Sequence, residues 1–142
     1  MGLAIRTTLM SRITETPSYT SERLMTLRVP LVKGEHATIL SCYAPTLVSD
    51  EEQKDAFYEQ LQQALSEVPR EDKIILLGDF NARVGADHHT WRGVLGPHGV
   101  GKMNSNGLRL LSLCQEFELS ITNTYYQQSN RNKTKMVHVR WI

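Results

Sequence analysis

The sequence predicts a mixed α/β fold in which helices cover a sheet. Alternating apolar and polar residues before residue 45 indicate two neighbouring strands. Apolar residues at helical spacing indicate helices over 49–69 and 110–117, and four consecutive apolar residues at 74–77 indicate a buried strand between them. Hairpin, helix, buried strand, helix and strand in this order are typical of a layered α/β domain, and 142 residues suit one such domain.

The composition excludes several classes of protein. With 16 Lys and Arg against 15 Asp and Glu, the net charge is +1. This balance excludes a protein that consists entirely of a disordered acidic or basic tail. The two cysteines, Cys42 and Cys114, are too few for a disulfide scaffold, and we expect both to be buried thiols in a reducing compartment. No apolar run approaches the roughly 20 residues of a membrane span. We therefore expect an intracellular protein, for which the nucleus is one compatible location. We see no targeting signal and expect no membrane partner.

The first half of the chain predicts strands. A first candidate strand covers residues 3–9. Residues 24–31 alternate between apolar and polar side chains and end at a proline, which is typical of a half-buried strand. Residues 37–44 are rich in apolar and β-branched side chains, and Pro45 stops them. The short turn at 32–35 between these two strands predicts an antiparallel hairpin.

A helix and a buried strand follow. Ser49 and Glu52 have the spacing of a capping box, which predicts the start of a helix that Pro69 ends. The apolar side chains at helical spacing within it are Phe57, Leu61, Leu65 and Val68. The strand at 74–77 is apolar throughout, so we expect it to be covered on both faces, with Gly78 at its end.

The remaining chain predicts a long loop, a helix and a short strand. The loop at 82–106 is rich in Gly, His and Asn, and long loops of this kind are usually functional or mobile. Leu110, Leu111, Cys114 and Phe117 indicate the second helix, and residues 119–123 alternate like a strand. So few strands leave sheet edges open, so we expect self-association through them.

Three polar side chains stand where strands end. Asp79 and Asn81 follow the buried strand, and ligand sites in layered α/β folds favour such strand ends. A carboxylate there can orient a water or help hold a hard cation, and the amide can donate to a phosphoryl oxygen. The phenol of Tyr43, at the end of the preceding strand, can donate to phosphate. The alternatives are an ordinary Asp/Asn turn and an aromatic side chain packed at a sheet edge.

A glycine-rich segment at 96–103 is nearly a phosphate-binding P-loop. Met103 replaces the hydroxyl residue that binds magnesium in such loops, Pro97 removes an amide donor, and no strand precedes the segment. A loop that presents Arg92 and Lys102 to an anionic partner is the better interpretation.

Taken together, these motifs resemble the endonuclease/exonuclease/phosphatase family, and most closely the apurinic-type endonuclease domain of non-LTR retrotransposons. The resemblance covers residues from about 2 to 134. We interpret residues 1–134 as a partial domain and residues 135–142 as a divergent tail. The segments that carry it are 41–46, 78–85, 91–96, 98–102, 104–107 and 121–124.

The resemblance implies a partial four-layered α/β sandwich with a mixed, mostly antiparallel sheet and covering helices. It implies metal-dependent hydrolysis of DNA phosphodiester bonds, with Mg²⁺ or Mn²⁺ held near Asp79 and Asn81. Asp79 then orients or deprotonates the attacking water, Asn81 positions that water and the phosphate, and Tyr43 contacts the scissile phosphate. The partner is DNA, and the basic side chains expected to contact it are Arg83, Arg92 and Lys102.

The chain also departs from the family pattern. Family members carry an Asn and a metal-binding Glu on strands ahead of the matched region, and an Asp-His pair on a late strand. Neither set is matched here, and His138 is no safe substitute for the histidine. We therefore expect an internal fragment without measurable magnesium-dependent nicking, since the loss of one electrostatic stabiliser typically lowers the rate ~100–1000-fold. The alternatives are a non-catalytic nucleic-acid-binding remnant and a phosphatase of the same family.

Overall fold

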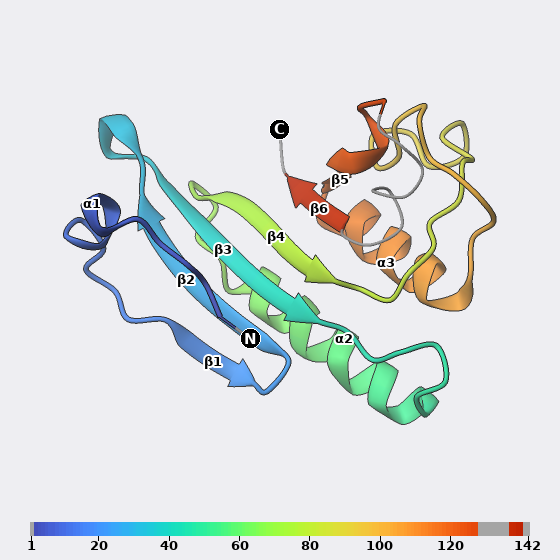
Figure 1. The fold of residues 1–142 in the computed structure, drawn as a ribbon, viewed down its shortest axis with the longest axis horizontal. Coiled ribbons are helices and arrows are strands. Elements are labelled where there is room, and N and C mark those ends of the chain that lie inside the picture. Colours follow the sequence, from blue (N-terminus) through green and yellow to red (C-terminus); the bar gives the residue numbers. More distant parts are fainter. Residues whose placement is uncertain (1, 128–136, 141–142) are drawn as a thin grey trace.

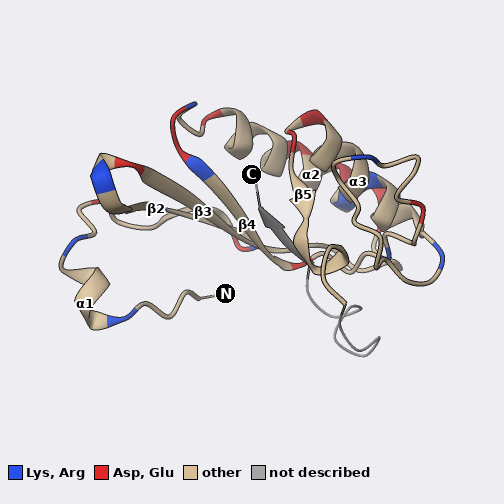
Figure 2. Ribbon diagram, turned by 90° about the horizontal axis from the view of Figure 1, so that it is seen from above, with Lys and Arg blue, Asp and Glu red and all other residues tan. Residues whose placement is uncertain are grey.

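The computed structural model describes residues 2–127 and the backbone of 137–140. These residues form one six-stranded sheet in the order β1-β2-β3-β4-β6-β5, with helices α2 and α3 packed on one face (Figures 1 and 2). Strands β3 and β4 are parallel, and the other neighbouring strands are antiparallel. The predicted mixed, mostly antiparallel sheet with covering helices is confirmed.

The elements have the following bounds. The strands are β1 Ser18–Ser21, β2 Leu24–Pro30, β3 His36–Tyr43, β4 Lys73–Asp79, β5 Ser120–Ile121 and β6 Val137–Arg140. The helices are α1 Thr7–Met10, α2 Glu51–Ser66 and α3 Ser105–Glu116, with single 3-10 turns η1 Val32–Gly34 and η2 Thr122–Thr124. Among the described residues, no helix combines the length and apolar character needed to cross a lipid bilayer.

The β2–β3 hairpin and helix α2 determine the centre of the sheet. Strands β2 and β3 pair along their length as predicted, and the turn between them places Lys33 and Gly34 at positive φ. Helix α2 then connects β3 to β4, which is why these two strands run parallel and end at the same edge of the sheet.

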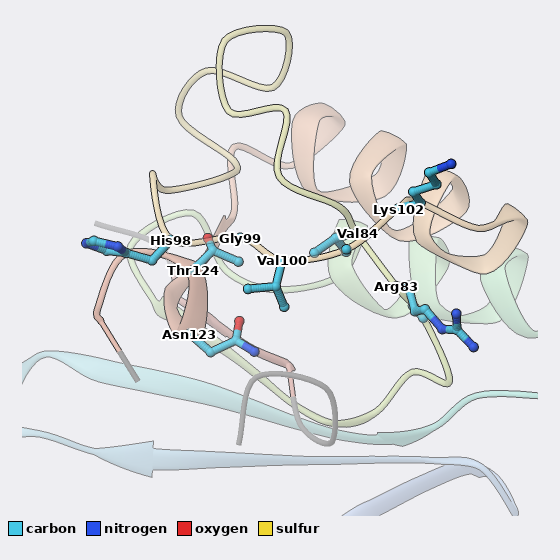
Figure 3. Close-up of a pocket in the computed structure, with 10 residues that line it drawn as sticks. Arg83, Val84, His98, Gly99, Val100, Lys102, Asn123 and Thr124 are labelled. Carbon is cyan, nitrogen blue, oxygen red and sulfur yellow. The ribbon is translucent and has the colours of Figure 1, made fainter. Parts of the chain in front are cut away.

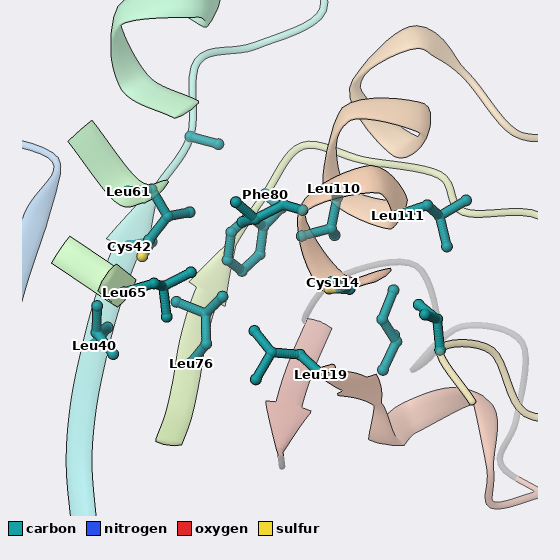
Figure 4. Close-up of a cluster of buried hydrophobic side chains, with 14 of the residues drawn as sticks. Leu40, Cys42, Leu61, Leu65, Leu76, Phe80, Leu110, Leu111, Cys114 and Leu119 are labelled. Atoms are coloured by element: carbon teal, nitrogen blue, oxygen red, sulfur yellow. The ribbon is translucent and has the colours of Figure 1, made fainter. Parts of the chain in front are cut away.

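The main core lies between the sheet and the two helices (Figure 4). Alternation along the strands directs one set of side chains toward the helices. The fully buried members of this cluster are Leu24, Leu40, Leu61, Leu76, Leu110, Leu111, Cys114, Leu119 and Ile121. The predicted helical periodicity of α2 and α3 is confirmed, because its apolar side chains are the ones that this core buries.

The opposite face of the sheet carries a smaller cluster. Leu27, Val29 and Ala37 are buried there, and side chains from the N-terminal segment pack against them. Residues 74–77 are therefore covered unevenly: Leu76 is fully buried against the helices, whereas Ile75 is only half-buried on the opposite face. The expectation of complete cover on both faces was wrong in this respect.

The strand predicted at residues 3–9 is not formed. The segment is irregular up to α1, where the carbonyl of Arg6 accepts the amides of Leu9 and Met10. Leu3 and Ile5 are instead partly buried against the smaller apolar cluster. Their alternation reflects side chains that pack onto a sheet face, a contact that does not require strand pairing.

The capping box is also not formed. Helix α2 begins at Glu51 with Asp50 as its N-cap, and the Asp50 side chain makes no capping hydrogen bond. The Ser49 hydroxyl lies 3.2 Å from that of Thr46, and its amide donates to the Thr46 carbonyl, so Ser49 belongs to the preceding turn.

The end of the described chain differs from the prediction in two ways. The alternation at 119–123 gives only the two-residue strand β5, because the Thr124 hydroxyl donates to the Ile121 carbonyl and curls the chain into η2. Strand β6, which no sequence pattern indicated, lies between β4 and β5. The rest of the expected tail, residues 135–136 and 141–142, lies outside the described residues.

Candidate active site

Tyr43 and Asp79 are direct neighbours at one edge of the sheet. They are the last residues of the parallel strands β3 and β4, and the register pairs them with each other. Paired residues of adjacent strands present their side chains to the same face. Asp79 is exposed and Tyr43 is 46% exposed, so phenol and carboxylate share one accessible surface. The structure thus brings together the two side chains that the strand ends single out.

A glycine permits the close contact of these strand ends. At Gly78, a Cβ atom would collide with the backbone carbonyl of Cys42 on the neighbouring strand. Only a residue without a side chain fits there. The expectation that Gly78 ends the strand was wrong: Gly78 lies inside β4, pairs with Cys42 and lets β4 approach β3 just before Asp79.

Asn81 fastens the two strand ends to each other. Its backbone, at φ 47°, lies in the left-handed region that Asn tolerates, and its amide donates to Asp79 Oδ1 at 2.9 Å. Its Nδ2 donates to the Ala44 carbonyl at 2.9 Å, and the Ala44 amide donates to the Asp79 carbonyl at 2.9 Å. Nδ2 uses one of its two N–H bonds on Ala44, so Asn81 keeps its second N–H as a donor and Oδ1 as an acceptor.

Arg23 is a cation at this edge that sequence reasoning missed. Its guanidinium carbon lies 5.6 Å from the centroid of the Tyr43 ring, and Nη1 donates to the Tyr43 carbonyl at 3.3 Å. Arg23 lies between β1 and β2, far from Tyr43 in sequence, so no spacing rule connects the two. Arg23 thus places a positive charge beside the Tyr43 ring, with the Glu22 carboxylate 3.8 Å from its Nε.

A pocket of about 260 Å³ is lined by the chain that directly follows Asn81 (Figure 3). Its walls come from residues 82–84, from the glycine-rich loop at 98–102 and from Asn123 and Thr124. Arg83 and Lys102 both belong to its lining, although their charged groups point away from the pocket and from each other (Figure 3). Arg92 is exposed but is not among the lining residues.

The oxygen donors of the edge suit a weakly held, hydrated divalent cation. Mg²⁺ prefers oxygen ligands, keeps several waters and is usually bound through one or two carboxylates together with substrate phosphates. The Asp79 carboxylate and Asn81 Oδ1 supply two such oxygens. Among residues 2–127, no group of three or more His, Cys, Asp or Glu side chains is placed to enclose a metal.

The cysteines are buried thiols, as predicted. Both are free and inaccessible. Burial raises the pKa of Cys114 to about 12 and raises the pKa of Cys42 well above its usual range. Thiols that stay protonated at neutral pH are poor nucleophiles. The polar strand ends, not the cysteines, are therefore the chemically competent part of the described chain.

Comparisons with known proteins agree with this architecture. A family model described as endonuclease-reverse transcriptase matches residues 37–139. Craniofacial development protein 2 from Bos taurus is 38% identical over 99 residues, which cover 70% of this chain and 16% of the relative. The same protein from Tragulus javanicus is 35% identical over 111 residues, 78% of this chain and 19% of the relative. The chain thus spans less than a fifth of the length of these curated relatives.

One solved structure has a similar fold. The 3′ phosphatase NExo from Neisseria, bound to a product DNA hairpin, matches with a TM-score of 0.52 and 14% sequence identity. The match covers 84% of this chain and 52% of that protein. The likeness establishes the fold class, which agrees with the one predicted from the sequence.

Proposed function

The chain belongs to the endonuclease–reverse transcriptase family, and we propose that it supplies the phosphate-contacting and water-orienting part of a metal-dependent site that hydrolyses DNA phosphodiester bonds. We further propose an origin in a retrotransposon endonuclease. The observation that carries the proposal is the pairing of Tyr43 with Asp79 on one exposed face, next to Arg23.

Each side chain of the edge has a defined part in this reaction. The Asp79 carboxylate, held by the Asn81 amide, accepts a proton from the attacking water and orients it. The Tyr43 hydroxyl donates to a phosphoryl oxygen, and Arg23 adds positive charge beside it. Mg²⁺ or Mn²⁺ near Asp79 and Asn81 Oδ1 would neutralise negative charge on the phosphoryl oxygens.

A second candidate function is DNA binding without cleavage. Arg83 and Lys102 line the pocket that adjoins Asn81, where they can contact the phosphates that flank the one at Tyr43. Among the described residues, Asp79 and Asn81 are the side chains that this edge offers as oxygen ligands, and no group of three or more His, Cys, Asp or Glu completes a metal site. We therefore expect the 142-residue chain by itself to bind DNA and to nick plasmid DNA below detection.

A DNA-binding assay with matched variants tests the proposal. In Mg²⁺, Tyr43→Phe should lower the affinity for duplex DNA roughly fivefold, because a hydrogen bond to a charged phosphate is lost. Asp79→Asn should remove the dependence of affinity on Mg²⁺. Tyr19→Phe is the control, since Tyr19 is a 70% exposed tyrosine on β1. Wild-type binding by both Tyr43→Phe and Asp79→Asn would overturn the proposal.

Cleavage assays separate the candidates. Affinity that falls steeply with salt, without nicking, supports the expected binding-only behaviour of this chain. Plasmid nicking that disappears in Asp79→Ala would establish hydrolysis and contradict that expectation. Release of inorganic phosphate from a 3′-phosphorylated oligonucleotide, without nicking, would contradict the endonuclease proposal and indicate a phosphatase instead.

A further inference from the structure

One buried side chain on α3 bridges the two strand ends of the site. Asn106 lies in the first turn of α3 and is 1% exposed. Its Nδ2 donates to the Pro45 carbonyl at 3.2 Å and to the Asn81 carbonyl at 3.1 Å. Pro45 lies two residues beyond the end of β3, and Asn81 lies two residues beyond the end of β4. A single carboxamide therefore holds both segments that carry the functional side chains.

The orientation of this carboxamide follows from its partners. A carbonyl oxygen only accepts hydrogen bonds, so the atom that faces both carbonyls must be the nitrogen. The other atom, Oδ1, is buried and has no hydrogen-bond partner. An unpaired buried acceptor is unfavourable, and an apolar side chain of similar size would avoid it. The two donated hydrogen bonds are thus what distinguishes Asn106 from a packing residue.

The N-terminus of α3 is fixed in place by an independent set of contacts. The Asn104 amide donates to the Arg83 carbonyl at 3.0 Å, while Asn104 Oδ1 accepts from the amides of Arg83 at 3.1 Å and Gly107 at 2.8 Å. At Gly107, a Cβ atom would collide with the Arg83 carbonyl. The helix is therefore seated directly on the chain that follows Asn81, and Asn106 reaches the strand ends from a fixed position.

We propose that Asn106 is a positioning residue that sets the spacing between Tyr43 and Asp79 by holding the carbonyls of Pro45 and Asn81. The hydrogen bonds between Ala44 and the Asp79–Asn81 turn join the strand ends directly, and Asn106 closes the arrangement from the helix side. The inference rests on the proposed function, because this spacing matters for activity only if both side chains act on one phosphate.

Amide hydrogen exchange measured by NMR on the whole chain, without DNA or metal, tests this role. In Asn106→Ala, exchange of the Ala44 and Asn81 amides should accelerate roughly tenfold. Amides in the middle of β3 and β4 should keep their wild-type rates. Gln62→Ala is the matched control, because it removes an exposed carboxamide that donates to Glu116 at 2.7 Å and leaves the site untouched.

Two further measurements keep the test decisive if Asn106→Ala folds poorly. In the unmodified chain, the side-chain amide protons of Asn106 should exchange more slowly than those of the exposed Gln62. Asn106→Asp keeps the size but puts acceptors against two carbonyls, so it should disturb Ala44 and Asn81 more than Asn106→Ala does.

The contrary outcomes are distinct. Unchanged exchange at Ala44 and Asn81 in both variants, or an equal acceleration at every amide, would overturn the positioning role. If the Asn106 variants change exchange at Ala44 and Asn81 as expected but the wild-type chain does not bind DNA, the proposed function is overturned and the positioning role of Asn106 stands.

Discussion

Asp72 is the buried charged residue on which acid stability should depend most. Its side chain is 0% exposed and accepts hydrogen bonds from Arg28 Nε at 2.7 Å, Arg28 Nη2 at 2.9 Å and the Thr38 hydroxyl at 2.8 Å. The Arg28 hydrogen bonds, outweighing the opposite effect of burial, lower the pKa of Asp72 below its ordinary value. Glu15 extends the pair at 3.3 Å from Arg28 and so connects the N-terminal segment to the sheet.

This lowered pKa predicts a loss of stability in acid. A carboxyl whose pKa is lower in the folded than in the unfolded chain stabilises the fold fully above about pH 4, and this contribution disappears as the pH falls through the lowered pKa. Asp72→Asn should reduce the free energy of unfolding at pH 7 by about 2 kcal/mol and flatten its decline in acid. Urea unfolding between pH 2 and 7 measures both effects.

The control for this prediction is Glu71→Gln, a change at the exposed neighbouring carboxylate. It should leave stability within about 0.5 kcal/mol of the wild type. An acid profile for Asp72→Asn that coincides with the wild-type profile would show that other carboxylates govern acid unfolding.

The positions of Asp79 and Tyr43 in the fold could be predicted because local sequence carries that information, whereas their roles stay a proposal. Asp79 and Tyr43 stand next to strand ends, and a strand end can be recognised from periodicity and breakers. Arg23 and Asn106 were missed because their significance arises from contacts with residues distant in sequence. The orientation of the Asn81 carboxamide could not be predicted either, since it depends on the carbonyl of Ala44, which follows the neighbouring strand β3.

At the scale of elements, periodicity located the hairpin, α2, β4 and α3 because each buries one apolar face in the same core. The failures have a common cause. Leu3 and Ile5 alternate but pack without pairing, and Ser49 has the right spacing for a cap but bonds within its own turn. A short local pattern indicates which structures a segment can form, and tertiary contacts determine which of them it adopts.

The edge strand β1 predicts self-association. Ser18, Tyr19 and Ser21 pair with β2, with a register shift at Thr20, and no other described strand pairs with the outer side of β1 (Figure 1). We expect dimers or larger species at micromolar concentrations. Thr20→Lys should raise the apparent dissociation constant roughly tenfold, because it places like charges opposite each other across the new interface.

Sedimentation velocity over a concentration series measures this association. Gln60→Lys, which adds the same charge on the exposed surface of α2, is the control and should associate like the wild type. A wild-type chain that sediments as a monomer at every concentration would contradict the expectation.

At the scale of the molecule, the described chain is one sheet with α2 and α3 on one face and the N-terminal segment on the other. A four-layered sandwich stacks two such sheets between two helical layers, so these residues provide two of its layers. The resemblance in sequence identified this fold, which periodicity alone could not distinguish from other layered α/β folds. Figure 2 shows acidic and basic residues distributed over many elements, in keeping with the net charge of +1, so an interaction with DNA must depend on local placement.

The most direct test is NMR chemical-shift mapping of the labelled chain with a short DNA duplex in Mg²⁺. The proposed site predicts the largest shifts at Arg23, Tyr43 and residues 79–83, weaker shifts at 98–102, and none at β1. Omission of Mg²⁺ should reduce the shifts at 79–81 most. Shifts confined to other surfaces, or none at Tyr43 and Asp79 at saturating DNA, would contradict the assignment of this edge as the phosphate site.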